Sequence, residues 1–304
     1  MSTYHKPVLL NECLEGLSIR PEGTYVDVTF GGGGHTRAIL ERLNEKGRVI
    51  AFDQDKDAVA NVIDDPRFTL VQQNFRYLSN FLKLHKAIPV DGILADLGIS
   101  SHQIDVPERG FSTRFEGPLD MRMNQSSGKT AADVINSYDE RDLKRLFAEY
   151  GEVDNAGRLV RLIAEARVNM RIATVSDLKN IIQPCMPRGK EFQYLAKVFQ
   201  ALRIEINGEI EALRQMLQQV PEVLKPGGRI AVISYHSLED RLVKNFFKSG
   251  DFEGKEEKDF YGNLIRPLYP VNRKPVLPTA EEIETNSRAR SARLRIAEKP
   301  PIGE

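Results

Sequence analysis

Short runs of apolar and β-branched residues alternate with segments of helical apolar spacing through the first third of the chain. The runs predict strands at 24–30, 48–53, 68–73 and 90–98, and the segments between them predict helices at 35–44, 56–63 and 78–85. Strands separated by helices of this length are typical of βαβ units in a parallel sheet. We therefore expect an α/β fold.

The pattern changes after Ser101. The stretch VPERGFSTRFEGPLDMRMNQSSGKT has many turn residues and little periodicity, which predicts a long functional loop. Beyond it, apolar residues recur at helical spacing, at 131–136, 140–150, 156–169, 175–183 and 192–207. This part of the chain is predicted to contain helices only.

The α/β pattern then returns, with a helix at 209–223, a turn at KPGG, a strand at 229–235 and a helix from HSLED. A sheet interrupted by a helical block predicts one Rossmann-like domain with an insertion. We expect the first part of that domain at 1–105, an all-helical subdomain for substrate recognition at 106–206, and the second part, with a basic C-terminal segment, at 207–304.

Charge and cysteine content limit the partners. The 304 residues carry 43 Lys plus Arg and 43 Asp plus Glu, so a nucleic-acid partner would need a local basic patch. Cys13 and Cys185 show no metal or disulfide spacing, which predicts two buried thiols. No apolar run approaches the roughly 18 residues of a membrane span, and we expect a cytoplasmic protein.

Four consecutive glycines follow the first predicted strand in VDVTFGGGGH, where a backbone without Cβ atoms can approach a ligand. A dinucleotide fingerprint needs a third glycine, but Thr36 or Arg37 stands there, depending on the register. A phosphate-binding P-loop needs a lysine, which His35 and Thr36 do not supply. A tight turn that binds no ligand is the structural alternative.

Acidic residues at strand ends narrow the choice of ligand. Asp53 ends the second strand about 20 residues after the glycines, where a carboxylate can accept both hydroxyl hydrogens of a ribose. Asp27 lies near the turn and could reach an ammonium group or the turn's own amides. A glycine turn with a ribose-binding acid and no diphosphate site indicates S-adenosylmethionine.

Two further stretches favour a methyl donor. VLKPGGRIAVIS is similar to the helix, turn and strand of class I methyltransferases, and Asp96 ends the fourth strand at the carboxyl edge, where open α/β sheets bind ligands. Methyl transfer from a sulfonium is an in-line displacement that depends on holding the acceptor in place. We expect Asp96, or an adjacent backbone carbonyl, to accept the hydrogens of a substrate amine.

The motifs together are specific. A series of motifs along the chain resembles the MraW/RsmH-type family of bacterial methyltransferases. In order they are HKPVLLNE, VDVTFGGGGH, AFDQD, NFRYL, VDGILADLGISSHQ, ERGFS, GPLDMRM, FQALRIEIN, VLKPGGR, SYHSLEDR and NSRARSARLR. The resemblance implies transfer of a methyl group from S-adenosylmethionine to N(4) of a cytidine in 16S rRNA of the small ribosomal subunit, with S-adenosylhomocysteine as product and no metal.

The resemblance also implies a set of donor-binding residues: Gly33, Gly34, His35, Asp53, Phe75, Asp96 and Gln103. Gly33 and Gly34 would let the backbone approach the methionine part, and Phe75 could pack on adenine. Ordinary core packing is the alternative for Phe75, and a local hydrogen-bonding cap is the alternative for His35. His102 replaces the family's usual proline, so we expect a less rigid loop around Gln103.

Four aromatic or imidazole side chains are candidates to line the acceptor pocket: Phe111, Phe115, Tyr235 and His236. An extruded base is held by stacking and read along its Watson–Crick edge. Core packing is the alternative for these side chains, and a helix cap by Ser237 with Asp240 in the first turn is the alternative for HSLED. Ring-carbon methylation of cytosine needs a thiolate, and the cysteine contexts therefore favour amine methylation.

The RNA must be held by local arginines. Arg288, Arg290, Arg293 and Arg295 lie in RARSARLR, which predicts a strand with its arginines on one side, and the helical block adds Arg167, Arg171, Arg188 and Lys190. A solvated surface is the alternative for these charges. The oligomeric state stays open, a homodimer included.

Two other classes of function compete with this hypothesis. One is a nucleotide-binding or RNA-chaperone protein that keeps the fold without catalysis, and the intact GGGGH, Asp53 and Asp96 speak against it. The other is a methyltransferase of DNA or of a small molecule. The helical insert favours a bulky, structured acceptor over a metabolite.

Overall fold

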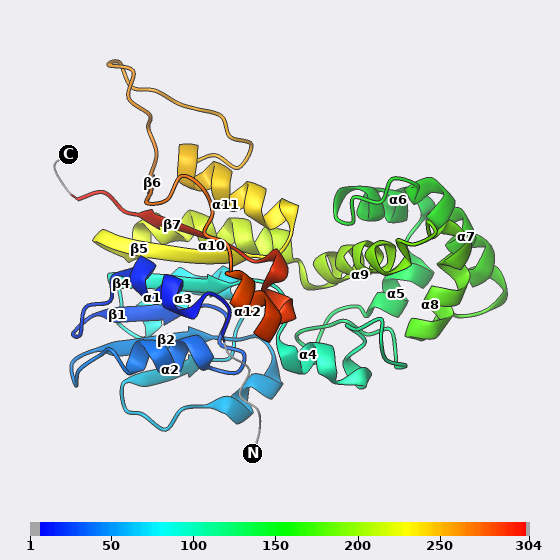
Figure 1. Ribbon diagram of the computed structural model, residues 1–304, viewed down its shortest axis with the longest axis horizontal. Coiled ribbons are helices and arrows are strands. Elements are labelled where there is room, and N and C mark those ends of the chain that lie inside the picture. Colours follow the sequence, from blue (N-terminus) through cyan, green and yellow to red (C-terminus); the bar gives the residue numbers. More distant parts are fainter. Residues whose placement is uncertain (1–6, 302–304) are drawn as a thin grey trace. The chain divides into compact units, whose positions relative to one another are not determined.

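The computed structural model describes residues 7–301 and divides into two compact units, Met1–Gly98 with Ile210–Glu304, and Ile99–Glu209 (Figure 1). His5 and Lys6, which begin the HKPVLLNE motif, lie outside the described residues. The predicted insert, 106–206, lies within the second unit. Its assignment to substrate recognition stays a prediction.

The first unit is built on a seven-stranded sheet in the order β3-β2-β1-β4-β5-β7-β6. Neighbouring strands from β3 to β5 are parallel, and β7 is antiparallel to both β5 and β6. The strands are β1 Thr24–Asp27, β2 Arg48–Phe52, β3 Phe68–Val71, β4 Val90–Asp96, β5 Leu224–Ser234, β6 Tyr269–Pro270 and β7 Arg293–Glu298. This is the α/β, Rossmann-like fold that the sequence predicts.

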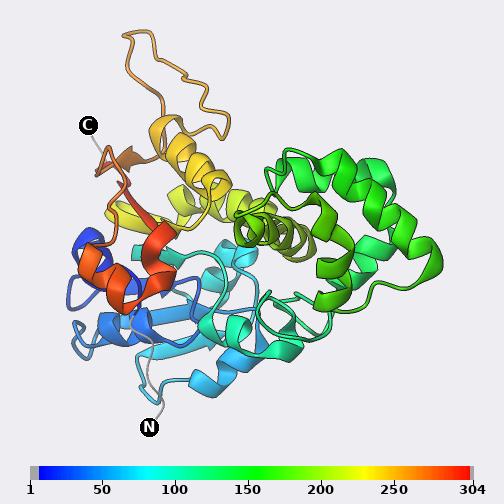
Figure 2. The ribbon, with the colours of Figure 1, turned by 45° about the vertical axis from the view of Figure 1, so that its right-hand side comes forward.

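Helices cover both faces of this sheet (Figures 1 and 2). Val26, Ile50 and Ile93 pack on one face with residues of α3, α10 and α11, while their strand neighbours Tyr25 and Val49 pack on the other with α1 and α2. Side chains that alternate between two buried faces explain why the strands are apolar throughout. The helices are α1 Leu10–Leu17, α2 Gly34–Leu40, α3 Leu78–Leu84, α10 Glu209–Val223, α11 Ser237–Ser249 and α12 Ala280–Thr285.

The four strands predicted in the first third are present, but each ends earlier than predicted because the chain leaves the sheet at its carboxyl edge. The predicted helix at 35–44 ends at Leu40. The segment predicted as a helix at 56–63 is the 3-10 helix η1, Lys56–Asn61, which begins after an Asp55 cap. A second 3-10 helix, η2 (Phe75–Tyr77), precedes α3.

The prediction of a turn at KPGG is wrong. β5 runs through this stretch, and its pairing with β4 shifts register between Val90 and Gly92, which marks an irregularity in the strand. Gly227 adopts φ 74°, and its amide donates to the carbonyl of Lys299. The glycines therefore bend a continuous strand instead of reversing the chain.

The prediction of one strand over RARSARLR is also wrong in its first half. Residues Ser287–Ser291 form the 3-10 helix η5, capped by the Asn286 side chain, and β7 begins at Arg293. Ala289 and Ala292 are buried in the core beside α1 and α2. The burial of these small residues explains the compact turn.

The second unit has a core of its own, formed by helices α5 to α9 and the preceding loop. Its elements are α4 Ser101–Asp105, η3 Pro107–Arg109, α5 Ala131–Ser137, α6 Glu140–Glu149, α7 Ala156–Asn169, α8 Val175–Ile182, η4 Gln183–Cys185 and α9 Glu191–Asn207. The long loop is largely irregular, as predicted, yet Leu119, Met121 and Met123 are buried in the core. The loop is thus part of the packed unit.

Within residues 7–301, every helix is too short or too polar to cross a membrane.

Candidate active site

The glycine turn joins β1 to α2 and is held by hydrogen bonds from distant side chains. Arg37 Nη1 donates to the Gly32 carbonyl over 2.7 Å, and Asn61 Nδ2 donates to the Gly31 carbonyl over 3.0 Å. Gly31 and Gly33 both adopt positive φ, 49° and 74°, where L-residues with side chains are strained. The turn is therefore a built structure with its carbonyls satisfied.

The glycines differ in what a side chain would meet. A Cβ on Gly33 would lie 2.9 Å from the Phe30 ring, and a Cβ on Gly34 would lie 2.4 Å from Pro7. A Cβ on Gly32 would meet no atom within 4 Å. Close packing thus accounts for Gly33 and Gly34, whereas the backbone at Gly32 borders open space that a ligand could enter. The predicted donor contacts of Gly33 and Gly34 stay predictions.

Asp53 follows β2 and contacts the turn directly. Its Oδ2 accepts a hydrogen bond from the Gly31 amide and its Oδ1 accepts one from the Asp55 amide, each over 2.8 Å. Burial raises the pKa of Asp53 to about 6, although these two amides lower it. Each carboxylate oxygen keeps a second lone pair, so the residue fits the predicted role of accepting two ribose hydroxyls.

Asp96, at the end of β4, is paired with Tyr235, the residue after β5. The Tyr235 hydroxyl donates to Asp96 Oδ1 over 2.7 Å, and the Asp96 amide donates to Thr29 Oγ1 over 2.7 Å. Burial raises the pKa of Asp96 to about 6, against the lowering effects of His35 and the Tyr235 hydroxyl. Burial, then the nearby Asp96 carboxylate, raises the pKa of Tyr235 well above its usual value, so the phenol stays a donor.

His35, in the first turn of α2, faces the second oxygen of Asp96. Its Nε2 lies 3.0 Å from the Val8 carbonyl, and its Nδ1 lies 3.8 Å from Asp96 Oδ2. A carbonyl can only accept, so Nε2 carries the hydrogen, and the distance from Nδ1 to the carboxylate is longer than a hydrogen bond. His35 therefore links the N-terminal segment to Asp96, beyond the local cap that was its alternative.

Asp27 has a structural role. Its Oδ1 accepts from the Thr29 amide over 3.0 Å, and its Oδ2 accepts from the Thr36 hydroxyl over 2.7 Å. The residue is 1% exposed, which closes it to the ammonium group considered from the sequence. Asp27 instead fastens both ends of the glycine turn.

His236 is the N-cap of α11, and its ring nitrogen Nδ1 lies 3.4 Å from the Glu239 amide. The sequence hypothesis that Ser237 caps this helix is therefore wrong, because Ser237 is already its first residue. Glu239 Oε2 in turn accepts from the Tyr235 amide over 2.9 Å. These contacts hold Tyr235 in place, while a direct role of His236 in substrate binding stays a prediction.

Phe75 and Gln103 lie in different units. Phe75, in η2, packs half-buried against the core beside α3 and α10. Gln103 is buried in α4, where its Oε1 accepts from the Ser100 amide and its own amide donates to Ser100 Oγ. This capping box orders the segment despite the His102 replacement. Donor contacts by Phe75 and Gln103 stay predictions.

Phe111 is 7% exposed in the core of the second unit, which matches its packing alternative. Phe115 is half-buried, and the Arg114 guanidinium lies 5.6 Å from the centre of its ring. Base stacking by either phenylalanine is untested and stays a prediction.

The arginines predicted to hold RNA fall into two groups. Arg295 is buried and donates through Nε and Nη2 to both oxygens of Asp240, over 2.7 and 3.1 Å, so the prediction of an RNA contact for it is wrong. Arg167 donates to the carbonyls of Ile135 and Tyr138, which is a structural role. The exposed side chains are Arg171, which pairs with Asp133 over 2.8 Å, Arg188, Lys190, Arg290 and Arg293, and Arg288 is half-buried.

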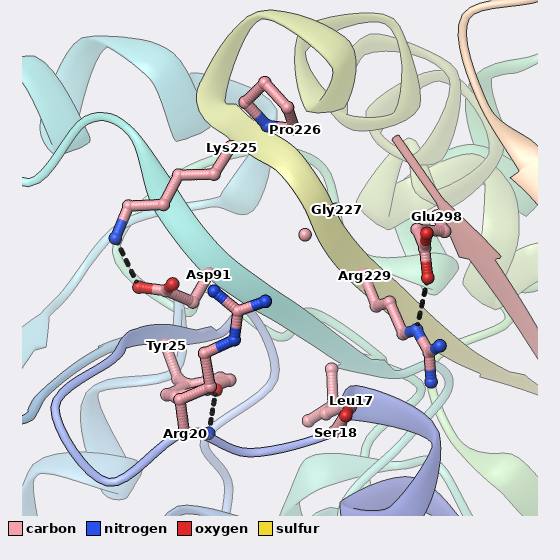
Figure 3. Close-up of a pocket in the computed structure, with 11 residues that line it drawn as sticks. Leu17, Ser18, Arg20, Tyr25, Asp91, Lys225, Pro226, Gly227, Arg229 and Glu298 are labelled. Atoms are coloured by element: carbon pink, nitrogen blue, oxygen red, sulfur yellow. Dashed lines mark hydrogen bonds and ion pairs between the residues drawn. The ribbon is translucent and has the colours of Figure 1, made fainter. Parts of the chain in front are cut away.

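A small cavity of about 180 Å³ lies at the opposite edge of the sheet, where β1 and β4 begin (Figure 3). Its lining includes Arg20, Asp91, Lys225, Arg229 and Glu298. Two ion pairs cross it, Lys225 with Asp91 over 2.6 Å and Arg229 with Glu298 over 2.7 Å. Because none of the predicted site residues line it, the candidate active site remains at the carboxyl edge.

Sequence spacing could not reveal the pairing of Asp96 with Tyr235, which are 139 positions apart. The strand order brings β5 beside β4, with Asp96 opposite Ile233, and that register sets the two side chains together. The only sequence signal was that both residues end predicted strands.

The sheet has five parallel strands in this order and an antiparallel β7. A glycine turn follows β1, and acids stand at the ends of β2 and β4. Together these features define a class I S-adenosylmethionine-dependent methyltransferase. The chain belongs to the MraW methylase family, which it matches over residues 2–300. This membership confirms the family that the sequence motifs predict.

The chain is similar to proteins named ribosomal RNA small subunit methyltransferase H. It is 57% identical to that of Bacteroides thetaiotaomicron over 98% of both chains, and 55% identical to that of Flavobacterium johnsoniae over 97% of this chain and 98% of the relative. Among solved structures, an rRNA methylase from Streptococcus thermophilus is 11% identical, with a TM-score of 0.42 over 98% of this chain and 99% of that chain. The fold class rests on the strand order and not on this last likeness.

Proposed function

We propose that the protein transfers a methyl group from S-adenosylmethionine to N(4) of a specific cytidine in 16S rRNA of the small ribosomal subunit, by direct in-line displacement. Family membership supports methyl transfer, and the names of the similar proteins support the rRNA substrate. The choice of the cytidine amine as the acceptor rests on the hydrogen bonding of the Asp96 carboxylate. Its Oδ1 is held by Tyr235, and its Oδ2 makes no hydrogen bond within residues 7–301.

The exocyclic amine of cytosine is a weak nucleophile because its lone pair is delocalised into the ring. A carboxylate that accepts a hydrogen from this amine favours the pyramidal geometry needed for attack. Asp96 Oδ2 is the acceptor that we assign to this step, and Tyr235 fixes the orientation of the carboxylate. A general base with a pKa near the working pH is suited to such a transfer, and that of Asp96 is raised to about 6.

The donor would be held by Gly33, Gly34, His35, Asp53, Phe75, Asp96 and Gln103. S-adenosylmethionine, when bound, supplies an electrophilic methyl group on a sulfonium. The residues of the chain orient the two reactants, a contribution of about 7 to 11 kcal/mol in favourable cases. Asp53 fits the ribose, and the open space at Gly32 fits a ligand close to the turn.

The cysteines speak against methylation of the ring carbon. Burial raises the pKa of the Cys13 thiol well above its usual value and raises that of Cys185 as well. Both thiols are buried and free, as the sequence predicts. Since the attacking species in ring-carbon methylation is a thiolate, neither residue is suited to form it.

RNA binding would use arginines of the C-terminal segment, in particular the half-buried Arg288 and the exposed Arg290. Contacts to phosphates would make binding fall steeply with salt.

Mass spectrometry of 16S rRNA nucleosides, from cells with and without the gene, tests this function. We expect N(4)-methylated cytidine to disappear from the cells that lack the gene. An unchanged methylcytidine profile would overturn the proposal.

A further inference from the structure

The segment between α11 and β6 forms an arm that projects from the first unit and is drawn in orange (Figures 1 and 2). Phe260 and Tyr261 lie in a tight turn of this arm, residues 259–263, which we call the tip, and they are 98% and 86% exposed. Their ring centroids are 5.7 Å apart and their planes are nearly perpendicular, at 88°. Large aromatic side chains with this exposure have no part in the core, so folding does not account for them.

The tip is an ordered turn. Asp259 Oδ1 accepts from the amides of Tyr261 and Asn263 over 2.8 and 2.9 Å, and its backbone pairs with Asn263 and Gly262. Lys258 and Leu264 form an antiparallel bridge below it. The Asn263 side-chain amide, which donates to Asp259 Oδ2 over 3.0 Å, and then the backbone amides lower the pKa of Asp259. The backbone hydrogen bonds fix the turn that carries both rings. The rings are therefore presented at little further cost in backbone entropy.

Among the residues that the structure describes, most acidic side chains of the arm have partners within the protein, whereas two of its lysines do not. Most acids are engaged within the protein: Glu256 pairs with Lys248 over 2.8 Å, Glu253 pairs with Arg214 over 3.3 Å, and Asp251 accepts from backbone amides. Within residues 7–301, the side-chain amines of Lys255 and Lys258 make no ion pair or hydrogen bond. Both lysines are exposed, and so are Glu257 and Asp259, so the two ammonium groups near the rings are balanced by two carboxylates.

We propose that Phe260 and Tyr261 stack on unpaired bases of the RNA substrate. Exposed aromatic rings beside unpaired lysines are a platform for single-stranded nucleic acid, because every base has a face that can stack. The proposal rests on the proposed function, since it takes rRNA as the partner. A protein surface is the competing occupant, which the test below separates.

The arm would contact RNA far from the reacting base. α11 starts next to Tyr235 at the carboxyl edge, and its 13 residues span about 20 Å before the arm begins. A contact at this distance needs an extended, structured substrate. It makes the tip a determinant of affinity for the subunit, with no part in the chemical step.

The chain contains no tryptophan, so Tyr261→Trp introduces a single tryptophan, which can be excited selectively, at the tip. We expect its emission to be quenched by a single-stranded RNA of about 12 nucleotides and by deproteinised 16S rRNA. In the full chain, Phe260→Ala with Tyr261→Ala should weaken binding to small ribosomal subunits about tenfold per ring. The dependence on salt should stay unchanged because no charge is removed.

Leu84→Ala is the matched control, because Leu84 is an exposed apolar residue of α3, 71% exposed. It should leave subunit binding unchanged, and all variants should keep the thermal midpoint of the wild type. Unaltered binding by the double variant, or quenching by intact subunits but not by either RNA, would overturn the proposal. Methyl transfer by the wild type is measured in parallel. Its failure would count against the proposed function, while the quenching experiment would still decide the role of the tip.

Discussion

The carboxylates at the two edges of the sheet have different partners: cations at the amino edge and neutral donors at the carboxyl edge. At the amino edge, Asp91 and Glu298 are neutralised by Lys225 and Arg229 in close ion pairs. At the carboxyl edge, the half-buried Asp53 accepts from backbone amides, and Asp96 accepts from a neutral phenol with its side chain 24% exposed. Only at the carboxyl edge does burial raise the pKa of the acids to about 6.

This difference distinguishes carboxylates that stabilise the fold from carboxylates that are available to bind or react with a ligand. An acid paired with a cation fastens two elements and has little capacity left for a ligand. Asp53 and Asp96 are desolvated acids held by neutral donors, with only the His35 ring 3.8 Å from Asp96, and such groups are costly to the fold and gather at functional sites. The edge with the small cavity is therefore the structural edge, and the edge with the perturbed acids is the candidate active site.

The largest expected effect comes from Asp96→Asn. The amide keeps the shape of the side chain but is a far poorer proton acceptor, so methyl transfer should fall by about 10²-fold to 10⁴-fold. Single-turnover rates with saturating donor and subunits measure this change. Full turnover with unchanged donor affinity would show that Asp96 does not accept the amine hydrogen.

Asp53→Asn comes next. Hydrogen bonds to a charged group contribute about 1.5–3 kcal/mol, so loss of the charge should weaken S-adenosylmethionine binding about 30-fold. Calorimetric titration of the donor provides the measurement. A donor affinity equal to that of the wild type would remove Asp53 from the ribose site.

Donor binding should also depend on pH. The ionised form of Asp53 accepts both ribose hydroxyls, and its pKa is about 6, so donor affinity should fall by up to about tenfold per pH unit below that value. Because the pKa of Asp53 is higher in the folded state than in the unfolded state, the folded state binds more protons between about pH 4 and pH 6. The contribution of Asp53 to the free energy of unfolding therefore declines as pH rises from about 4 to about 6.

Donor titrations and thermal midpoints between about pH 4 and pH 8 measure both effects. Asp53→Asn should flatten both dependences. Identical pH profiles for the wild type and this variant would assign the titration to another group.

Tyr235→Phe should have a smaller effect. Removal of the hydroxyl that stabilises the ionised carboxylate should raise the pKa of Asp96 further. The acidic limb of the rate profile should therefore move to higher pH, with a rate loss of a few-fold near neutral pH. A uniform loss at all pH values, without displacement of the limb, would indicate a packing role only.

The smallest effect is expected at the amino edge. Lys225→Gln breaks the ion pair with Asp91, but Lys225 is 40% exposed and Asp91 keeps the amide of Thr24 as a partner. The free energy of unfolding should fall by about 1 kcal/mol or less, and methyl transfer should not change. Chemical denaturation and transfer assays test this. A large loss of methyl transfer by Lys225→Gln would contradict the assignment of a purely structural role to the amino edge.

Much of the fold could be predicted from the sequence because the central strands β1, β2 and β4 are buried on both faces. That burial leaves short apolar runs, which alternate with helices in a recognisable order. The KPGG stretch and RARSARLR were predicted wrongly for a common reason. The conformation of each depends on partners far along the chain, Lys299 for Gly227 and the core around Ala289 for η5.

The candidate site could be predicted in part. Gly33, His35, Asp53 and Asp96 follow strands, and the carboxyl ends of parallel strands meet at one edge. The bond between Asp96 and Tyr235 and the burial of Arg295 against Asp240 depend on strand order and register, which no local pattern contains. A row of arginines alone cannot show which of them is buried.

The most direct test is methyl transfer in vitro. Purified protein is incubated with S-adenosylmethionine carrying a labelled methyl group and with small ribosomal subunits from cells that lack the gene, and the rRNA nucleosides are then separated by mass spectrometry. We predict that the label appears on N(4) of cytidine in 16S rRNA and that its rate of appearance falls by about 10²-fold or more with Asp96→Asn. Label on the ring carbon of cytosine, on another base, or on no nucleoside would contradict the account.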